Sequence, residues 1–250
     1  MWHPGRPWTP LAASSASHSL VESFGLRPSE RRPVLDLGHP GLTTRDAAHT
    51  KMAAVLPVVI LHWNRPERCV GTVARFLDQD VPGGVRVVVV DNGSEPEALA
   101  SVRKGLPIGV PLLELPRNRG FGPGANAGFR HVLANPEPGD VDWIGLAPHD
   151  AEPAPGCLAR MLEVVGERPR AGLACADFGD GATPVVDPYF GGILAPATVA
   201  EGWEPAGHPH GTLLLARRTV LVDVGLFDER YFAYCEEADL ALRAAAAHQP

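Results

Sequence analysis

A run of apolar residues near the middle of this chain ends abruptly in a histidine and two carboxylates. The run Trp143–Ala147 is typical of a buried strand, and Pro148 stops it. The side chains that follow include His149, Asp150 and Glu152. In an open α/β sheet, ligands bind just beyond the carboxyl ends of the strands, so acids placed there face a ligand. Asp150 is therefore a candidate metal-holding residue, since one or two carboxylates and substrate phosphates commonly hold Mg²⁺. A role in turning the chain or capping a helix stays open.

A second group of acids lies near the end of the chain. Glu236, Glu237 and Asp239 fall within four residues, directly after the aromatic-rich segment 231–234. Negative charge is favourable in the first turn of a helix, which alone would explain acids there. The aromatic residues upstream would in addition desolvate a carboxylate and raise its pKa toward the range useful to a general base.

The remaining pattern predicts the elements that must position these acids. Strands are expected at 56–63, 85–90, 111–115, 143–147, 172–178 and 211–216, and helices at 66–79, 95–104, up to about 134, 155–168, 217–224 and from 236 onward. Valine-rich strands that alternate with helices indicate a mostly parallel sheet covered on both faces. The polar residues at the strand ends would then lie along one edge.

A glycine- and asparagine-rich turn, residues 118–128, follows the third expected strand. Several glycines at a strand-to-helix turn let the backbone approach a phosphate or sugar closely. Gly122, Gly124 and Ala127 also match a dinucleotide-binding fingerprint, with Asp142 at about the distance of its ribose-binding acid. This match follows the third strand rather than the first, so a dinucleotide-binding enzyme is an alternative and not the main hypothesis.

The segment 179–210 is rich in Gly, Pro and Ala. Such a stretch in a compact domain is typical of a functional loop or lid. His208 and His210 lie at its end, and without further ligands in the sequence we interpret them as solvent-exposed loop residues.

Composition limits the possible classes of function. The chain has 250 residues, enough for one sizeable domain, and a formal charge of −7 without a dense basic cluster, so nucleic acid is not an expected partner. Four scattered cysteines without metal-ligand spacing indicate a reduced, cytoplasmic compartment. The apolar stretch 53–63 is interrupted by Pro57 and too short to cross a bilayer, so no transmembrane segment is expected.

The first part of the chain differs from the rest. Residues 1–52 carry Pro, Ser, Arg and His without apolar periodicity, and we predict a disordered extension, with Met52 as an alternative start. Residues 53–250 form the predicted domain.

Four motifs in order resemble the family 2 glycosyltransferases with a GT-A fold, especially their rhamnosyltransferase-like branch. They are the second-strand turn at 88–94, the turn at 118–128, the segment 213–229 and the acidic motif at 231–243. The resemblance covers about 56–243. It implies a GT-A-type α/β fold and inverting transfer of a hexosyl or deoxyhexosyl group from a nucleoside-diphosphate sugar to an acceptor hydroxyl. The implied role is in cell-surface polysaccharide, glycolipid or glycoconjugate synthesis.

The resemblance also implies roles for single residues. The donor-binding residues would be Asn64, Asp91, Asn118, Gly120, Gly124 and Asn126. Asp91 would contact the base or ribose of the nucleotide. Glu237 stands at the second position of the family's Glu-Asp pair and would be the catalytic base, with Asp239 as a contender.

The metal site implied by the resemblance is incomplete. Asp150 matches the last acid of the family's DxD-type motif, with Glu152 in a supporting part, whereas Pro148 replaces the first acid. A divalent cation, Mg²⁺ or Mn²⁺, is the implied cofactor. Whether the chain requires it stays open.

The implied partners are the nucleotide-sugar donor and a saccharide or lipid-linked acceptor, with peripheral contact at the inner face of the plasma membrane. Family members commonly continue past the acidic helix, so the end at Pro250 suggests a truncated domain. Three alternatives remain: a catalytically impaired relative that only binds nucleotide sugar, a Rossmann-type enzyme and a nucleotidyltransferase. The main hypothesis requires Asp91, Asp150 and Glu237 to converge at one edge of the sheet.

Overall fold

The computed structural model describes residues 54–177, 182–198 and 203–247. The predicted disordered extension, residues 1–52, lies outside this part of the chain and stays a prediction. Within the described ranges, no helix combines the length and the apolar character needed to span a bilayer.

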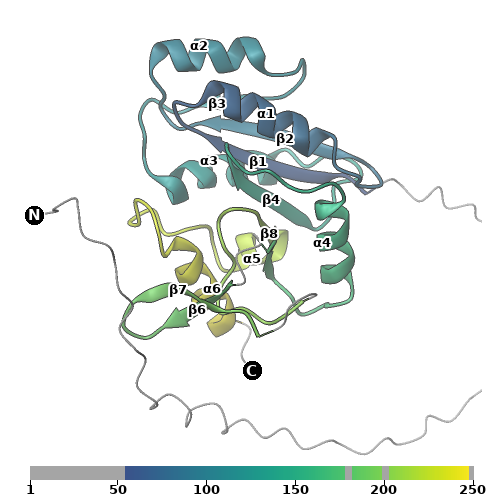
Figure 1. Cartoon of the computed structure of the whole chain (residues 1–250), viewed down its shortest axis with the longest axis vertical. Coiled ribbons are helices and arrows are strands. Elements are labelled where there is room, and N and C mark those ends of the chain that lie inside the picture. Colours follow the sequence, from purple (N-terminus) through teal and green to yellow (C-terminus); the bar gives the residue numbers. More distant parts are fainter. Residues whose placement is uncertain (1–53, 178–181, 199–202, 248–250) are drawn as a thin grey trace, which may run out of the picture. The chain divides into compact units, whose positions relative to one another are not determined.

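A six-stranded sheet forms the centre of the described domain (Figure 1). In spatial order its strands are β3 (Leu112–Glu114), β2 (Val85–Asp91), β1 (Leu56–His62), β4 (Trp143–Pro148), β8 (Leu214–Arg217) and β5 (Leu173–Cys175). β1 pairs in parallel with β2 and β4, and β2 pairs in parallel with β3. β8 is antiparallel to both β4 and β5. The prediction of a mostly parallel sheet is therefore confirmed.

The helices lie close to their predicted places. They are α1 (Pro66–Leu77), α2 (Pro96–Gly105), α3 (Phe121–Ala134), α4 (Cys157–Gly166), α5 (Arg218–Asp223) and α6 (Glu236–Ala247). Helix α1 begins at Pro66, where the missing N–H needs no intrahelical partner. Its residues Cys69, Val73 and Phe76 recur on one face and are fully buried, as helical periodicity requires.

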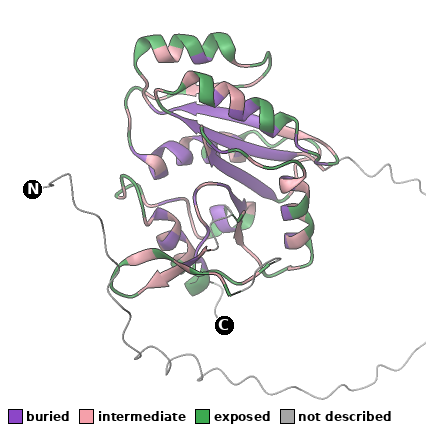
Figure 2. Cartoon of the chain, in the orientation of Figure 1, coloured by how far each residue is buried: buried purple, intermediate pink, exposed green. Residues whose placement is uncertain are grey.

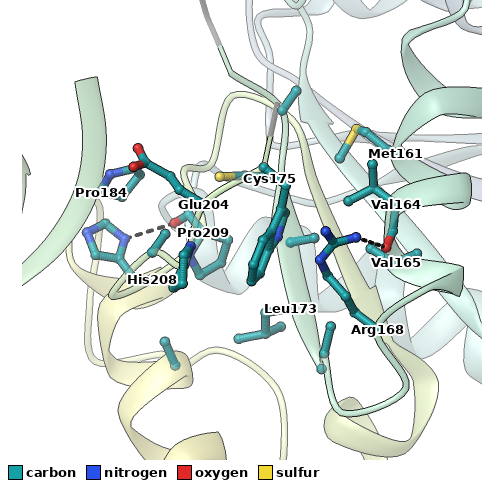
Figure 3. A pocket seen from close by; sticks show the side chains of 18 of the residues that line it. Met161, Val164, Val165, Arg168, Leu173, Cys175, Pro184, Glu204, His208 and Pro209 are labelled. Carbon is teal, nitrogen blue, oxygen red and sulfur yellow. Dashed lines mark hydrogen bonds between the residues drawn. The ribbon is translucent and has the colours of Figure 1, made fainter. Parts of the chain in front are cut away.

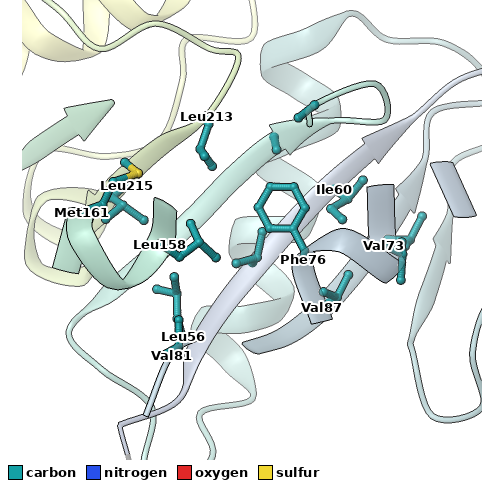
Figure 4. Packing of buried hydrophobic residues seen from close by; sticks show 14 of the residues in the cluster. Leu56, Ile60, Val73, Phe76, Val81, Val87, Leu158, Met161, Leu213 and Leu215 are labelled. Atoms are coloured by element: carbon teal, nitrogen blue, oxygen red, sulfur yellow. The ribbon is translucent and has the colours of Figure 1, made fainter. Parts of the chain in front are cut away.

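Side chains of the central strands alternate between two apolar layers. Val58 and Ile60 face the layer that includes Phe76 of α1 and Leu158 of α4 (Figure 4). Val59 and Leu61 contribute the alternate side chains to the opposite layer, which α3, α5 and α6 cover. Figure 2 shows the result, a buried sheet between helices whose outer faces are exposed.

The segment that sequence composition marked as a loop contains a hairpin. Strands β6 (Ala182–Asp187) and β7 (Gly191–Pro196) pair in antiparallel register and form a second, two-stranded sheet. The carboxylate of Asp187 accepts hydrogen bonds from the N–H groups of Tyr189 and Phe190, each at 2.8 Å, and so closes the turn. Residues 178–181 and 199–202 of the expected loop lie outside the described residues.

The pairing registers bring several strand ends to one edge of the sheet, called here the carboxyl rim. His62 at the end of β1 lies beside Asp91 at the end of β2, and Leu61 lies beside Pro148 of β4. Because β8 runs antiparallel to β4, the residues that precede β8, including Gly211, lie beyond the same end of β4. Every segment that carries a predicted catalytic or metal-binding acid therefore reaches this rim or follows directly from it.

Candidate active site at the carboxyl rim

Asp91 forms a buried pair with His62. The Nδ1 atom of His62 lies 2.8 Å from Oδ1 of Asp91, and both side chains are fully buried. The second carboxylate oxygen of Asp91 accepts a hydrogen bond from the Ser94 N–H at 3.0 Å. Burial opposes ionisation of Asp91, but the hydrogen bonds from His62 and Ser94 outweigh it and hold its pKa below the ordinary value. Both oxygens of this predicted donor contact are thus engaged inside the protein.

Asn64 connects the loop after β1 to the loop after β2. Its backbone N–H donates to Ser94 Oγ at 2.9 Å, and its side-chain oxygen accepts from the Glu95 N–H at 2.7 Å, directly before α2. Asn64 adopts a left-handed conformation with φ of 52°. Asparagine tolerates this region better than most residues, so the side chain both permits and stabilises the turn.

Asn118 and Gly120 shape the rim between β2 and α3. Asn92 Nδ2 donates to Asn118 Oδ1 at 3.1 Å and to the Gly120 carbonyl at 2.9 Å, while Asn92 Oδ1 accepts from the Arg119 N–H at 3.1 Å. Gly120 has φ of 98°, and a Cβ there would overlap the carbonyl oxygen of Phe232. The Phe121 N–H donates to that same oxygen at 2.7 Å. These contacts hold the start of α3 against the loop that precedes α6.

Gly124 and Asn126 lie inside α3. A Cβ on Gly124 would come within 2.7 Å of a Leu61 methyl group, so only glycine permits this close approach to β1. The buried amide of Asn126 donates to the Phe227 carbonyl at 2.9 Å and accepts from the Phe227 N–H at 3.0 Å. It therefore fixes the segment before α6 through both backbone groups of one residue.

Glu237 lies in the first turn of α6, against Gly211, which stands three residues before β8. A Cβ on Gly211 would overlap its Oε1, and the ring of Phe121 lies at the same place. Burial raises the pKa of Glu237, while hydrogen bonds from its own amide and from the Gly211 amide act in the opposite direction. A desolvated carboxylate held by few donors is suited to accept a proton.

Glu236, its neighbour, is almost fully buried, and its Oε2 has no hydrogen-bond partner among the described residues. Burial, and then the nearby charge of Glu237, raise the pKa of Glu236 to about 7. The two adjacent carboxyl groups cannot both ionise without cost, so the first turn of α6 holds a coupled acid pair.

Asp239, the contender for the catalytic base, forms an ion pair within α6. Its Oδ2 accepts from Arg243 Nε at 2.8 Å, one helical turn later. The same guanidinium donates to the carbonyls of Val224 at 3.1 Å and Leu226 at 2.7 Å. Asp239 thus orients an arginine that holds the segment after α5, which favours Glu237 as the base.

The two predicted metal-binding acids follow β4 and lie beside α1. Asp150 Oδ2 is 3.9 Å from Arg68 Nη1, and Glu152 Oε1 is 3.5 Å from Arg75 Nη2, with all four side chains about half exposed or more. Thr72 Oγ1 donates to the His149 carbonyl at 2.7 Å and so anchors this loop to α1. Residues 54–177, 182–198 and 203–247 contain no group of three or more His, Cys, Asp or Glu side chains suited to a metal. The exposed oxygens of Asp150 fit a hard cation that takes most of its ligands from phosphates and water.

A separate cavity of about 1170 Å³ lies at the edge strand β5 (Figure 3). Its lining includes Leu173 and Cys175 of β5, Met161 of α4, and Arg168, whose guanidinium stacks 4.1 Å from the centre of the Trp203 ring. None of the predicted catalytic, donor-binding or metal-binding residues lines it. The predicted site at the rim and this cavity are therefore two separate features of the domain.

His208 at this cavity corrects the interpretation of an exposed loop histidine. It is buried, its Nδ1 lies 2.9 Å from the Pro209 carbonyl oxygen, and its Nε2 has no partner among the described residues. A Cβ on Gly192 of β7 would lie 2.9 Å from that Nε2, so the hairpin is what covers the ring. Sequence composition gave no sign of this hairpin, and hence none of the burial.

The sheet is mostly parallel and is covered by helices on both faces. Its carboxyl rim carries a desolvated acid, asparagine-rich turns and an exposed carboxylate. Together these are the features of a GT-A-type glycosyltransferase domain. Residues 58–224 match Glycosyl transferase family 2, and because this is more than half of the chain, the chain belongs to that family. The predicted family and fold class are confirmed.

One sequence relative and one solved structure are similar to this chain. The N-acetylglucosaminyl-diphospho-decaprenol L-rhamnosyltransferase of Mycobacterium tuberculosis is 28% identical over 222 residues, which cover 77% of this chain and 71% of the relative. The mannosyltransferase PcManGT from Pyrobaculum calidifontis, solved in complex with GDP-Man and Mn²⁺, superposes with a TM-score of 0.54 at 18% identity and supports the fold alone. That match covers 78% of this chain and 53% of the mannosyltransferase, so this chain spans about half of that protein.

The alternatives are not favoured. Gly122 and Gly124 of the dinucleotide-like fingerprint lie within α3, where packing against Phe227 and Leu61 accounts for the missing side chains. Sequence reasoning missed His62, because its pairing with Asp91 depends on strand register. It also missed the ion pair of Asp239 with Arg243, although Asp and Arg four residues apart on a helix are a readable signal.

Proposed function

We propose that this chain transfers a hexosyl or deoxyhexosyl group from a nucleoside-diphosphate sugar to a hydroxyl of a lipid-linked saccharide, with inversion at the anomeric carbon. The observation that carries the proposal is the position of Glu237. Its desolvated carboxylate lies at the carboxyl rim, where the resemblance to family 2 glycosyltransferases implies a base. The relative from M. tuberculosis, named for a diphospho-decaprenol acceptor, supports the choice of acceptor.

Glu237 removes the proton of the acceptor hydroxyl as its oxygen attacks the anomeric carbon. The bond from that carbon to the donor diphosphate breaks, and the nucleoside diphosphate leaves with the bonding electrons. Attack opposite the leaving group inverts the anomeric carbon. Because Glu237 and the loop of Asp150 both reach the rim, base and leaving group can occupy opposite sides of one sugar.

The donor site extends over the loops after β1 and β2 and the turn before α3. Asn64, Asn118 and Gly120 form its backbone frame, and Gly124 and Asn126 hold α3 in place behind it. Asp91 serves this site indirectly, through His62 and Ser94, because both its oxygens are already paired.

Asp150 would hold a divalent cation, Mg²⁺ or Mn²⁺, with Glu152 in a supporting part. When bound, the cation offsets negative charge that develops on the departing diphosphate. The Mn²⁺ of the mannosyltransferase complex supports this proposal. Arg68 beside Asp150 forms only an exposed pair, which a cation can replace at little cost.

A lipid-linked acceptor requires contact with a membrane, and we place this contact on the cytoplasmic side, at the inner face of the plasma membrane. The described helices offer no membrane span. We propose that the contact is peripheral.

The test is a panel of nucleotide sugars assayed for thermal stabilisation and transfer, with and without Mn²⁺. A ligand that binds the native state raises the apparent melting temperature, so the correct donor should stand out. Transfer from that donor to a saccharide acceptor, with loss of transfer in Glu237→Gln, is the expected result. Binding without transfer would favour the catalytically impaired relative.

A further inference from the structure

Four aromatic side chains stand out from the surface beside the carboxyl rim. Tyr189 and Phe190 form the turn of the β6–β7 hairpin and are 86% and 70% exposed. Phe232 and Tyr234, in the loop before α6, are 62% and 85% exposed. The described part of the chain holds only two other large aromatic residues with comparable exposure, Trp63 and Trp203. We call Tyr189, Phe190, Phe232 and Tyr234 together the aromatic tip.

The two halves of the aromatic tip adjoin each other. A Cβ on Gly191, next to Phe190, would lie 3.2 Å from Sγ of Cys235, so the hairpin turn contacts the loop before α6. Figures 1 and 2 show the hairpin turn and this loop as exposed segments on the same side of the domain.

Both halves of the tip are held rigidly. Asp187 accepts hydrogen bonds from the N–H groups of Tyr189 and Phe190 and fixes the hairpin turn. In the other half, Tyr234 and Cys235 have φ of 72° and 69°, a left-handed conformation that non-glycine residues rarely adopt. Such strained backbone conformations are typical of functional sites. With this backbone conformation, the Tyr234 side chain is largely exposed.

Arginines flank the tip on the side of α3. They are Arg119 and Arg130, which both pair with Glu229, and Arg230, which pairs with Asp228. The arginine side chains are 41%, 56% and 89% exposed, against 31% for Glu229 and 20% for Asp228. The acids that begin α6, Glu236, Glu237 and Asp239, are buried or half-buried, so the exposed charge beside the tip is mostly positive. Asp187, the acid on the hairpin side, turns its carboxylate onto the amides of its own turn. The local charge is therefore complementary to an anionic surface.

Exposed apolar patches mark sites of protein or membrane interaction. Amphipathic aromatic rings next to arginines are typical of surfaces that lie in the headgroup region of a bilayer. A protein seated on the tip would cover the rim where the acceptor must enter, because α6 with Glu237 begins two residues after Tyr234. A bilayer would instead deliver a lipid-linked acceptor to that rim.

We propose that the aromatic tip inserts into the headgroup region of an anionic bilayer and so presents Glu237 to the acceptor. This inference rests on the proposed function for its lipid-linked acceptor. The binding of the tip to anionic lipid does not depend on that acceptor and is measurable without it.

The experiment is co-sedimentation of the full chain with vesicles of phosphatidylglycerol and phosphatidylcholine, or of phosphatidylcholine alone. The test variant replaces both Tyr189 and Phe190 with serine, and the matched control is Ile108→Ser, a fully exposed apolar residue between α2 and β3. The wild type and the control should bind the anionic vesicles, with weaker binding at high salt. The tip variant should bind about tenfold less or weaker still, since two of the four aromatic side chains of the tip are lost.

A second measurement separates this inference from the proposed function. The tip variant should lose transfer to an acceptor embedded in vesicles but keep transfer to a water-soluble, short-chain form of the same acceptor. If neither the wild type nor the tip variant transfers sugar to either form of the acceptor, the proposed function is refuted. Vesicle binding would still test the tip. Equal vesicle binding by wild type and tip variant would overturn the inference. So would a wild-type dimer that the tip variant splits, because the tip would then be an interface between two copies.

Discussion

His62 and Asp91 are bonded across the ends of two neighbouring strands, with 2.8 Å between Nδ1 and Oδ1. His62 Nε2 accepts a hydrogen bond from the Arg65 N–H at 3.1 Å, so the ring carries its proton on Nδ1 and donates it to Asp91. Oδ2 of Asp91 accepts from Ser94. One buried carboxylate therefore orders both loops that the nucleotide is expected to contact.

Asp91→Asn is expected to destabilise the fold and to weaken the binding of all nucleotide-sugar donors to the same extent. Asparagine keeps one acceptor oxygen, so its NH₂ group would face the proton of either His62 or Ser94. Leaving such buried groups unpaired costs about 1–3 kcal/mol, which lowers the melting temperature of a domain of this size by several degrees. Thermal unfolding and donor KM values for several nucleotides are the measurements.

Direct contact between Asp91 and the base predicts a different result. In that case the variant would keep its melting temperature and raise KM for one nucleotide only. A pH series adds a check. Since the folded pKa of Asp91 is depressed, its contribution to stability is present above the unfolded value of about 3.9 and is lost as pH falls through the folded value.

Much of the fold was predictable because its central strands are long and apolar. The runs at 56–63 and 85–90 predicted β1 and β2 to within one residue at each end. The β6–β7 hairpin was not predictable from a segment rich in Gly, Pro and Ala. Its strands form by pairing with each other, and a Cβ on Gly192 would lie 3.2 Å from Ala238 of α6, a tertiary contact that local sequence does not encode.

The candidate site was predictable in residue type and place, but less in role. Polar residues at strand ends were expected at one rim, and the parallel pairing of β1, β2 and β4 brings them there. The roles depend on distant partners. Asn126 bonds to Phe227, 101 residues away, and no sequence signal distinguishes this structural amide from one that contacts a donor.

Glu237→Gln should abolish transfer, whereas Asp239→Asn should mainly destabilise the protein. General-base catalysis contributes about 10²–10⁴-fold, so the glutamine variant should fall by that factor in kcat while it remains folded. Asp239→Asn weakens the ion pair with Arg243 and loosens its hold on Val224 and Leu226, which should lower the melting temperature. Single-turnover kinetics and thermal unfolding of both variants make the comparison.

The pH profile of the wild type provides a second test of Glu237. Burial raises its pKa, so the acidic limb of kcat/KM should lie above the ordinary range for a glutamate. If Asp239→Asn is folded but inactive and Glu237→Gln turns over normally, Asp239 is the base and Glu237 is not.

Glu236→Gln should stabilise the protein increasingly as the pH rises. Its pKa is raised to about 7 in the folded chain, against about 4.3 for an exposed glutamate. The folded state therefore holds the proton more tightly, and this stabilisation, complete below about pH 4.3, is lost as the pH rises to about 7. Glutamine stays neutral, so the gap in melting temperature between variant and wild type should widen across this window and then level off. Glu97→Gln, an exposed acid in the first turn of α2, provides the baseline, and a gap that does not change with pH would contradict the prediction.

Asp150→Ala and Glu152→Ala should separate cation binding from surface charge. Both side chains follow β4, both lie beside an arginine of α1, and both are largely exposed, so neither substitution should change the melting temperature of the free protein much. With donor present, Mn²⁺ should raise the melting temperature of the wild type and of Glu152→Ala, because cation and donor bind the native state together. Asp150→Ala should lose most of this increase and the associated transfer, since one carboxylate and the diphosphate are the expected ligands.

If both variants keep the full response to Mn²⁺, the cation does not bind at the end of β4. If donor alone gives the full stabilisation and transfer in the presence of a chelator, Arg68 and Arg75 of α1 are positive groups at this place that could take over from a cation. Arg68→Ala, next to Asp150, then becomes the variant that should lose both.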